Sequence, residues 1–552
     1  MLDVNLIKIY ERSFCDNREL PALTDYFKKE TFSYCEMAKE IAKIHLLFEK
    51  AKIKQGDKIA LLGRANPRWC IAYLATMTYG AVIVPILQDF NNNDIIHIIN
   101  HSESKLLFVG DNYWDAIEPE QVERIEAVFS LTDFHCIYER DGHHLNRFQK
   151  DITKHYRDAY PDGFAADHIK YPDIPNDRVI LLNYTSGTTG YSKGVMLTVN
   201  NLTANVQFAI DEKIYFKGSR VLSFLPLAHA YGCAFDFLSP MAEGTHVTLL
   251  GKIPVAKILM EAMVEVKPHL VCCVPLILEK IYRKQVAPLL EKGAMRWALK
   301  IPLIDKAIYS TIRKKLLDVF GGTVGQFIVG GAAVSPDTEE FLMRIRFPIT
   351  VGYGMTETAP LVSYTYWTGF KPGSVGRFLQ NYLEVKIDSP DPANIAGEII
   401  VRGENVMKGY YKNDVATREV LREGWLRTGD IGTMDDDGTL YIRGRSKTMI
   451  LSASGQNIYP EEIEAKLNNL YLVMESLVVE REGRLVAMVY PDYDTAQTEG
   501  VADETIPDIM ESNLDELNTL VAPYERVASI VIYPTEFEKT PKKSIRRYLY
   551  QL

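Results

Sequence analysis

Residues 183–198 read NYTSGTTGYSKGVMLT, and the interpretation of the chain starts from this run. Gly187 and Gly190 allow successive backbone N–H groups to converge on one point, because glycine tolerates positive φ and leaves room for an approaching oxygen. Lys193 adds a positive charge. The hydroxyl groups of the run belong to Thr185, Ser186, Thr188 and Thr189. Such a group of donors is suited to binding the β- and γ-phosphates of a nucleotide.

The run differs from a Walker A loop, in which Gly-Lys-Ser/Thr opens a helix. Here Lys193 stands three residues after Gly190, and the flanking segments VILLNYT and GVMLT are apolar and β-prone. The sequence therefore predicts a loop between two strands. A solvated Gly/Ser/Thr hairpin without a ligand explains the same composition equally well.

Length and composition narrow the class of protein. At 552 residues, the chain is long enough for about three or four structural units. The formal net charge of −10 argues against a general nucleic-acid binder, which usually presents a basic face. Seven cysteines without CxxC spacing fit a reducing, cytoplasmic location. The sequence shows neither a signal-peptide pattern nor an apolar run of about 18–20 residues, so we expect no transmembrane segment and at most peripheral membrane contact.

Strands and helices are expected to alternate through the first third of the chain. The apolar spacing predicts a helix over 31–55, with Thr31 as its cap, and strands over 58–63 and 82–87. The segments IAYLATMTYGA and DIIHIINHSES have helical spacing, and KLLFVGD follows as a further strand. This alternation indicates a largely parallel, doubly wound sheet.

The same alternation continues after the glycine-rich run. Residues 221–232, VLSFLPLAHAYG, are expected to end a strand and enter a helix, and THVTLLG and HLVCCVP are expected to be strands around a helical KILMEAMVEV. Residues 325–334, GQFIVGGAAV, predict a strand that runs into a turn of small residues. A flat ring could lie against such a turn, or Ser335-Pro336 could simply open a helix there.

Two later segments carry charged candidates. Residues 349–360, ITVGYGMTETAP, contain Tyr353, Thr356 and Glu357, and a carboxylate near a polyphosphate is a usual ligand of Mg²⁺, although an isolated Glu is more often a solvated surface residue. From residue 396 short β segments with Gly turns predict a small antiparallel subdomain or barrel. We expect Asp430 and Arg445 at strand ends, where they could hold ribose hydroxyls or phosphate.

Six motifs follow one another along the chain: YTSGTTGYSKG, LPLAHAYG, GGAAV, GYGMTE, GWLRTGD and GRSKTMI with GQNIYPEEIE. In order and wording they resemble the adenylate-forming superfamily of acyl-CoA synthetases, luciferases and peptide-synthetase adenylation domains. The segment from LPLAHAYG to VPLILEKIYRK looks most like bacterial long-chain fatty-acid–CoA ligases. The resemblance implies an α/β fold with a large N-terminal portion of doubly wound sheets and a small β subdomain, residues 1–446. A small mobile α+β C-terminal domain, residues 447–552, would follow a hinge near Lys447.

The resemblance also implies roles for individual residues. Ser186, Thr188, Thr189 and Lys193 would hold pyrophosphate, with Thr185, Gly187, Gly190 and Gly354 in the same nucleotide-binding set. Thr356 would contact the α-phosphate, and Glu357 would bind Mg²⁺. Gly331, Ala332 and Tyr353 would flank adenine, Asp430 and Arg445 would contact the ribose, and His229 would lie near the acyl carboxylate or its tunnel.

One departure from the family pattern concerns the last motif. Family members carry a lysine, typically in T-P-x-x-K-I, which bridges the substrate carboxylate and the α-phosphate, whereas this chain reads Thr540-Pro541-Lys542-Lys543-Ser544-Ile545. Ser544 cannot supply a positive charge, so either Lys543 takes that catalytic role from the neighbouring position or adenylation is weak. The basic run would otherwise be a solvated or CoA-phosphate-facing patch, made of Lys542, Lys543, Arg546 and Arg547.

The implied reaction consumes ATP, a fatty acid and coenzyme A and yields acyl-CoA, AMP and pyrophosphate. Transfer of the acyl group to an acyl carrier protein is an alternative, because the motifs do not specify the thiol. A weakly catalytic acyl- or nucleotide-binding protein is a second alternative, which Ser544 motivates.

Overall fold

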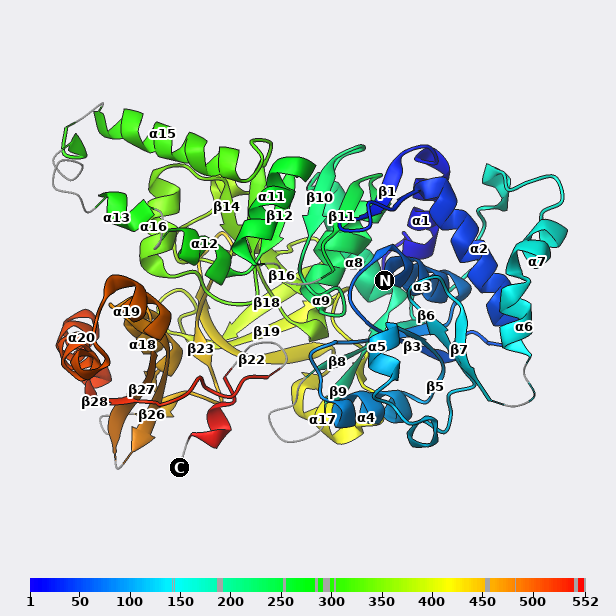
Figure 1. Ribbon diagram of the computed structural model, residues 1–552. Coiled ribbons are helices and arrows are strands. Elements are labelled where there is room, and N and C mark those ends of the chain that lie inside the picture. The colour runs from blue at the N-terminus through cyan, green and yellow to red at the C-terminus, as the bar shows by residue number, and fades with distance from the viewer. Residues whose placement is uncertain are drawn as a thin grey trace.

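The computed structural model describes residues 1–140, 142, 144–185, 192–251, 255–282, 286–290, 298–301, 304–451, 457–481, 483–540 and 545–550. Two large sheets with helices on their faces form most of the molecule, and a smaller body that contains the last strands and helices lies at the lower left of Figure 1. The expected α/β architecture of doubly wound sheets is confirmed.

The first large sheet has the order β14-β13-β12-β10-β11-β1-β2. Each neighbouring pair is parallel except β1 and β2. The strands are β14 (Ile349–Val351), β13 (Gln326–Val329), β12 (Leu270–Cys273), β10 (Arg220–Ser223), β11 (His246–Leu249), β1 (Pro21–Asp25) and β2 (Thr31–Ser33). Its crossovers include α11 (Ala256–Val266), α12 (Pro275–Ile281), α15 (Ile304–Val319) and α16 (Pro336–Arg344), as the alternating pattern predicts.

The second large sheet has the order β20-β9-β8-β4-β3-β5-β6-β7. Its central strands from β8 to β6 are parallel, and antiparallel strands close both edges. The strands are β20 (Gly409–Tyr410), β9 (Lys193–Thr198), β8 (Val179–Thr185), β4 (Val82–Ile86), β3 (Lys58–Leu62), β5 (Ser104–Val109), β6 (Ala127–Ser130) and β7 (Cys136–Glu139). The helices α3 (Pro67–Tyr79), α4 (Asn92–Ser102) and α8 (Val199–Asp211) belong to the same region.

Both predicted boundaries of the helix over 31–55 are wrong, since the helix also ends at Lys50 rather than at residue 55. Residues 31–33 form strand β2, and the helix α2 (Tyr34–Lys50) begins only after Ser33. Ser33 is the N-cap, because its hydroxyl accepts from the backbone N–H of Glu36 while the Glu36 carboxylate accepts from the backbone N–H of Ser33. This capping box outcompetes Thr31, whose side chain instead hydrogen-bonds Thr24 across the hairpin.

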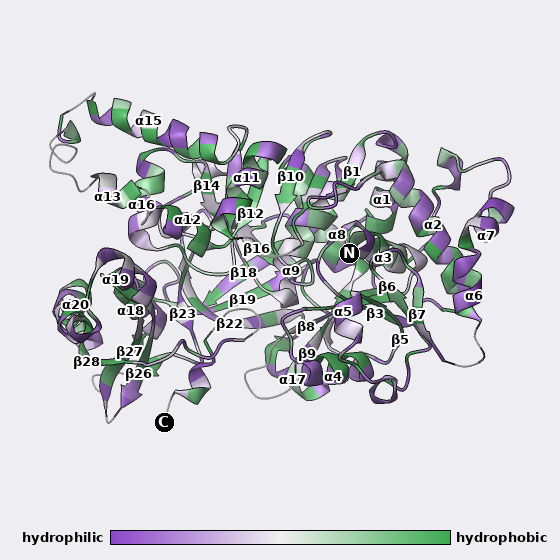
Figure 2. Ribbon diagram, in the orientation of Figure 1, coloured by the Kyte–Doolittle hydropathy of each residue, from purple (hydrophilic) through white to green (hydrophobic). Residues whose placement is uncertain are grey.

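Hydrophobic side chains fill the sheets and the helix faces turned toward them. Figure 2 shows hydrophobic residues on strands such as β3 and β6 and many hydrophilic residues on the peripheral helix α7 (Ile152–Ala159). Cys272 and Cys273 lie in β12 and are buried, as expected for core residues. None of the seven cysteines forms a disulfide.

A small antiparallel sheet follows the two large ones, as the change of periodicity after residue 396 predicts. Its order is β18 (Leu383–Asp388), β19 (Gly397–Gly403), β22 (Trp425–Met434) and β21 (Leu421–Arg422), with β23 (Leu440–Arg445) paired to β22. A further short sheet joins β15 (Tyr353–Gly354), β16 (Leu361–Tyr364) and β17 (Arg377–Phe378).

The last part of the chain has hydrophobic clusters of its own. The strands β26 (Val473–Arg481), β27 (Arg484–Pro491) and β28 (Val527–Ile532) form a sheet against α18 (Pro460–Leu467) and α20 (Ile506–Leu520). The main cluster of the preceding part extends to Leu440, and the next cluster begins at Ile458. Lys447 lies in this interval, in an exposed turn after β23, so we keep the boundary and hinge there as a proposal.

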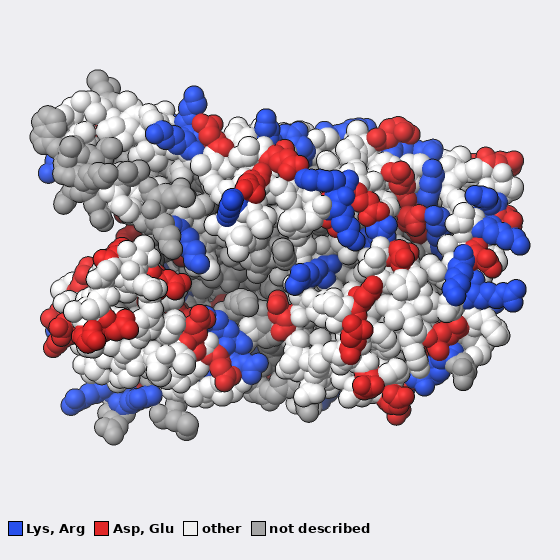
Figure 3. Space-filling view, in the orientation of Figure 1, with Lys and Arg blue, Asp and Glu red and all other residues white. Residues whose placement is uncertain are grey.

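On the face shown in Figure 3, basic and acidic side chains are interspersed. No helix in the described ranges combines enough length with enough apolar sequence to cross a membrane.

Candidate active site

The glycine-rich run connects two antiparallel strands, as predicted. In the register of β8 and β9, Thr185 lies opposite Lys193. Both strands are continuous with the second large sheet through the pairing of β8 with β4. Five predicted phosphate-binding residues lie outside the described residues: Ser186, Gly187, Thr188, Thr189 and Gly190. The described strands therefore bring Thr185 and Lys193 together at the base of the loop.

Lys193 and Glu357 approach each other through Tyr410. Strand β20 pairs with β9, and the Nζ of Lys193 lies 5.1 Å from the centroid of the Tyr410 ring. The hydroxyl of Tyr410 donates a hydrogen bond of 2.9 Å to Oε1 of Glu357. Burial raises the pKa of Tyr410, and the neighbouring Glu357 carboxylate raises it further. The Tyr410 hydroxyl is therefore a neutral donor to a carboxylate at physiological pH.

Asp430 stands at the centre of a second cluster. The Tyr353 hydroxyl donates to Oδ2 of Asp430 over 2.6 Å, and Nε of Arg445 lies 2.9 Å from Oδ1. Burial raises the pKa of Asp430, an effect that Arg445 and Tyr353 oppose and Glu357 reinforces. Tyr353, which bonds Asp430, stands four residues before Glu357 in the same segment, so the two clusters adjoin there.

The expected position of Asp430 at a strand end is wrong. Asp430 lies inside β22, directly opposite Arg445 in the register with β23, whereas Arg445 does end its strand. The register of the pair shifts between Ile431 and Gly432, which marks a bulge. A bulge redirects side chains locally, so an interior strand position can face a site.

Thr356 and Glu357 lie in a single 3₁₀ turn, Thr356–Thr358, and both are buried. Gly354 precedes this turn, where a Cβ atom would lie 2.1 Å from the Pro360 carbonyl oxygen. Such a contact is impossible, so Gly354 is required for the close approach of two backbone segments. The glycine thus has a packing role whether or not it contacts a nucleotide.

The turn after β13 is open to solvent. Gly331 has φ of +87°, no atom lies within 4 Å of the position that a Cβ would take there, and Ala332 is exposed. Ser335 is the N-cap residue of α16, so the expected strand, turn and helix are all present. The exposed turn of small residues also leaves room for a flat ring, so the two expectations for this segment are compatible.

The motif that contains His229 lies between strands of the two large sheets. Its Nδ1 accepts from the backbone N–H of Tyr231 over 3.3 Å and caps α9 (Ala230–Gly232). Asn183 of β8 donates to the Ala228 carbonyl over 3.3 Å, which ties this motif to the strand that enters the loop. On its other side, the Tyr231 hydroxyl donates to the Ile328 carbonyl over 2.8 Å. The motif that contains His229 is thus bonded to β8 on one side and to β13 on the other.

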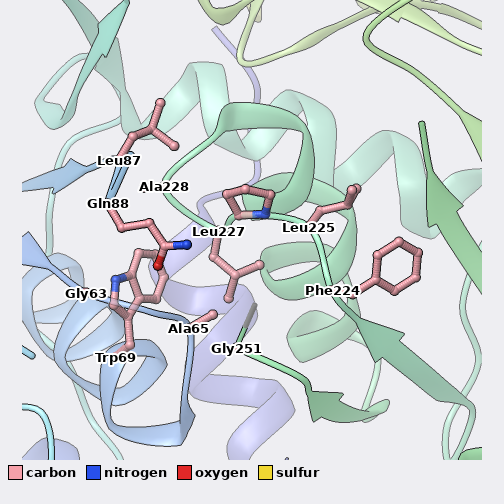
Figure 4. A pocket seen from close by; sticks show the side chains of 11 residues that line it. Gly63, Ala65, Trp69, Leu87, Gln88, Phe224, Leu225, Leu227, Ala228 and Gly251 are labelled. Carbon is pink, nitrogen blue, oxygen red and sulfur yellow. The ribbon is translucent and has the colours of Figure 1, made fainter. Parts of the chain in front are cut away.

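A narrow pocket opens beside this motif (Figure 4). Its walls are the residues that follow β3, β4, β10 and β11, so the carboxyl ends of parallel strands from both large sheets meet there. Trp69 and Gln88 line one side, and Leu225, Leu227 and Ala228 line another. Ligands of doubly wound proteins bind outside the carboxyl ends of the strands, and Ala228 places this pocket next to His229.

The C-terminal segment approaches the site through the end of β23. The Thr448 hydroxyl, one residue after Lys447, donates to Oε1 of Glu461 over 2.6 Å. Arg547 forms an ion pair with the buried Glu464 of α18, which anchors the last described residues to the same helix. Lys543 and Ser544 lie outside the described residues.

Tyr410 is the residue of this site that sequence reasoning missed. It lies in MKGYYK, which carries no charge pattern or glycine pattern that points to nucleotide binding. Only the antiparallel pairing of β20 with β9 brings it next to Lys193. The remaining candidates with described positions, from Thr185 to Arg445, lie at the loop base, in the motif of His229, in the Gly331 turn, in the turn Thr356–Thr358 with the preceding Gly354, and in the Asp430 cluster.

Comparison with known proteins assigns this arrangement to a family. The family model described as AMP-binding enzyme matches residues 11–411, most of the chain. The chain belongs to the AMP-binding enzyme family. The family expected from the six motifs is therefore confirmed.

Individual members of the AMP-binding family differ in the acid that they use. A long-chain-fatty-acid–CoA ligase of Mycobacterium tuberculosis is 28% identical over 93% of this chain and 89% of its own length. A 4-coumarate–CoA ligase of Petroselinum crispum is also 28% identical, over 82% of this chain and 77% of its own. ATP-bound MatB from Rhodopseudomonas palustris has a TM-score of 0.75 at 21% identity, over 99% of this chain and 98% of its own, and shows the common fold.

Proposed function

We propose that this AMP-binding enzyme joins a long-chain fatty acid to coenzyme A in two steps. In the first, a carboxylate oxygen bonds to the α-phosphorus of ATP while the bond to pyrophosphate breaks, which gives acyl-AMP. In the second, the sulfur of CoA attacks the acyl carbon, the thiol proton is released and AMP leaves. The observation that carries the proposal is the convergence of Lys193, Glu357 and Asp430 on one region through Tyr410, Tyr353 and Arg445.

The two clusters have complementary chemistry in this reaction. ATP and a carboxylate repel each other, so a catalyst must place positive charge and dipoles around the phosphates. Lys193 supplies a cation at the base of the loop, and Thr356 would donate to the α-phosphate. Asp430 would offer carboxylate oxygens to the ribose hydroxyls, with Arg445 beside them, and adenine would bind against the Gly331 turn and the Tyr353 ring.

The residues also fit a magnesium ion. Proteins hold Mg²⁺ with one or two carboxylates together with substrate phosphates, more often than with a complete protein cage. Glu357 is such a carboxylate, and within the described ranges no group of three or more His, Cys, Asp or Glu could hold a metal alone. Bound with the nucleotide, the ion would neutralise phosphate charge. Glu357 would hold it, and Tyr410 would orient Glu357.

The preference for a long fatty acid is supported by relatives rather than by pocket shape. Long-chain ligases are among the similar proteins, but so is a ligase named for 4-coumarate. His229 would lie beside the acid carboxylate, and the narrow pocket at Ala228 lies next to this residue. A cytoplasmic location, with membrane contact only from the surface, agrees with the composition and is part of the proposal.

The test is a screen of CoA-dependent AMP formation over saturated acids from two to eighteen carbons, with 4-coumarate as the competing acid. The proposal predicts the highest kcat/KM for acids of about twelve carbons or more, since each buried methylene contributes ~0.8 kcal/mol. A preference for 4-coumarate or for short acids would refute it. A parallel assay with acyl carrier protein in place of CoA separates the two acceptors.

Ser544 supports a second candidate, a nucleotide- and acyl-binding protein with little catalysis. It predicts tight ATP binding without acid-dependent release of pyrophosphate. Release of pyrophosphate with any acid in the screen would rule it out.

A further inference from the structure

Tyr410 connects two parts of the candidate site that are distant in sequence. Its ring lies beside the Nζ of Lys193, and its hydroxyl is bonded to Glu357. Lys193 stands at the start of β9, whereas Glu357 lies in the turn after β15. Only 6% of the Tyr410 residue surface is exposed, so the ring fills the space between these elements rather than lying over them.

The backbone around Tyr410 is fixed on both sides. The N–H groups of Lys408 and Tyr411 donate to the carbonyls of Met196 and Gly194 in β9, over 3.0 and 2.8 Å. The N–H of Met407 donates to the carbonyl of Glu357 itself, over 2.8 Å. Residues 407–411 are therefore a strap that is bonded to the lysine strand and to the glutamate turn at once.

A further contact holds the strap in register. The backbone N–H of Tyr410 donates to the Thr417 hydroxyl of α17 (Asp414–Val420) over 2.9 Å. Gly409 has φ of +140°, and a Cβ atom there would lie 2.8 Å from a side-chain carbon of Thr417. The helix α17 thus packs against the strap, and the Tyr410 side chain has little freedom to turn away from Glu357.

Each end of the side chain has a distinct physical effect. The hydroxyl fixes one oxygen of Glu357, which leaves the carboxylate in one rotamer, and hydrogen bonds to ligating carboxylates tune metal binding in this way. The ring face lies within cation–π range of the Lys193 ammonium, which restrains a long and otherwise flexible chain. One side chain therefore sets the separation between the positive and the negative group.

We propose that Tyr410 is a positioning residue that holds Glu357 and Lys193 at the spacing required for a divalent cation bound together with a nucleotide polyphosphate. The inference rests on the proposed function for the identity of the ligand. The hydroxyl acts on the cation through Glu357, and the ring acts on the polyphosphate through Lys193. The two actions can be separated by substitution.

Three variants of the full chain separate them. Tyr410→Phe removes the hydroxyl and keeps the ring, and Tyr410→Leu removes both. Tyr411→Phe is the matched control, because the hydroxyl of this adjacent tyrosine donates to Glu103, away from Glu357. The first measurement is Mn²⁺ affinity in the presence of saturating ATP, determined by electron paramagnetic resonance. The second measurement is ATP affinity in the presence of EDTA, determined by calorimetry.

Tyr410→Phe is expected to weaken Mn²⁺ binding about 10-fold and to leave ATP affinity in EDTA unchanged. Loss of a hydrogen-bond partner of a metal ligand typically lowers metal affinity about 10- to 100-fold, and the expected loss is at the lower end of this range. Tyr410→Leu is expected to weaken both, and Tyr411→Phe neither. Unchanged Mn²⁺ affinity in Tyr410→Phe, or an equal loss in Tyr411→Phe, would overturn the proposal. Both measurements concern binding, so they test the role of Tyr410 even if no acid supports the reaction. A lack of reaction with every acid would count against the proposed function alone.

Discussion

Replacement of Asp430 by Asn should separate nucleotide recognition from stability. Asp430 is 4% exposed and accepts from Tyr353 while it pairs with Arg445. In the proposed complex it also accepts from ribose hydroxyls. A hydrogen bond to a charged group contributes roughly 1.5–3 kcal/mol, and each 1.4 kcal/mol is a factor of ten in affinity. Asp430→Asn should therefore weaken AMP binding by about 10- to 150-fold.

The stability of the same variant relative to wild type should depend on pH. Burial raises the pKa of Asp430 above its usual 3.8, so the folded chain favours the protonated acid more than the unfolded chain does. This contribution to stability is fully present below pH 3.8 and is lost as pH rises through the higher folded-state pKa. Asn carries no such charge. The melting temperature of Asp430→Asn relative to wild type should therefore increase between pH 4 and pH 7.

Calorimetry with AMP and with 2′,3′-dideoxy-AMP measures the recognition part directly. The dideoxy compound lacks both hydroxyl groups, so its affinity should be nearly the same for wild type and Asp430→Asn. Thermal melts at a series of pH values measure the stability part. Equal losses of affinity for AMP and for the dideoxy compound would refute contact between Asp430 and the ribose. A melting-temperature difference between variant and wild type that does not rise from pH 4 to pH 7 would refute the electrostatic argument.

Three further substitutions test the remaining elements of the proposal. Lys447→Pro should leave acid-dependent pyrophosphate release intact and block thioester formation, because it stiffens the turn expected to be the hinge; unchanged overall turnover would exclude that hinge. Lys543→Ala should abolish pyrophosphate release yet preserve thioester formation from supplied acyl-AMP, and equal loss of both would exclude a charge role in adenylation. Gly354→Ala should destabilise the fold by about 1–3 kcal/mol in a denaturant melt, because the new Cβ overlaps the Pro360 carbonyl, whereas wild-type stability would contradict that packing.

The sequence predicts strands and helices correctly where the residues of a segment themselves determine its conformation. Continuous apolar runs such as Lys58–Leu62 and Val82–Ile86 indicate buried parallel strands, and both are in the second large sheet. The end of α3 at Gly80 follows from the positive φ of that glycine, +88°. Thr31 is the wrong cap because Ser33 forms a capping box together with Glu36. The start of the helix can be predicted only when these two residues are considered together.

The site is predictable in composition but not in geometry. Tyr353, Glu357, Asp430 and Arg445 are recognisable from motifs, yet their contacts depend on how β22 pairs with β23 and how β15 is placed beside them. Tyr410 cannot be found in this way. Its importance arises from the pairing of β20 with β9, a contact between segments more than two hundred residues apart, which periodicity does not encode.

The most direct test of acid activation is isotope exchange between pyrophosphate and ATP, catalysed by the wild-type enzyme in the absence of CoA. If Lys193, Glu357 and Asp430 act together on a magnesium nucleotide, exchange should appear only when a carboxylic acid is added and should be fastest with a long fatty acid. Tight binding of ATP with no exchange in the presence of any acid would contradict the account.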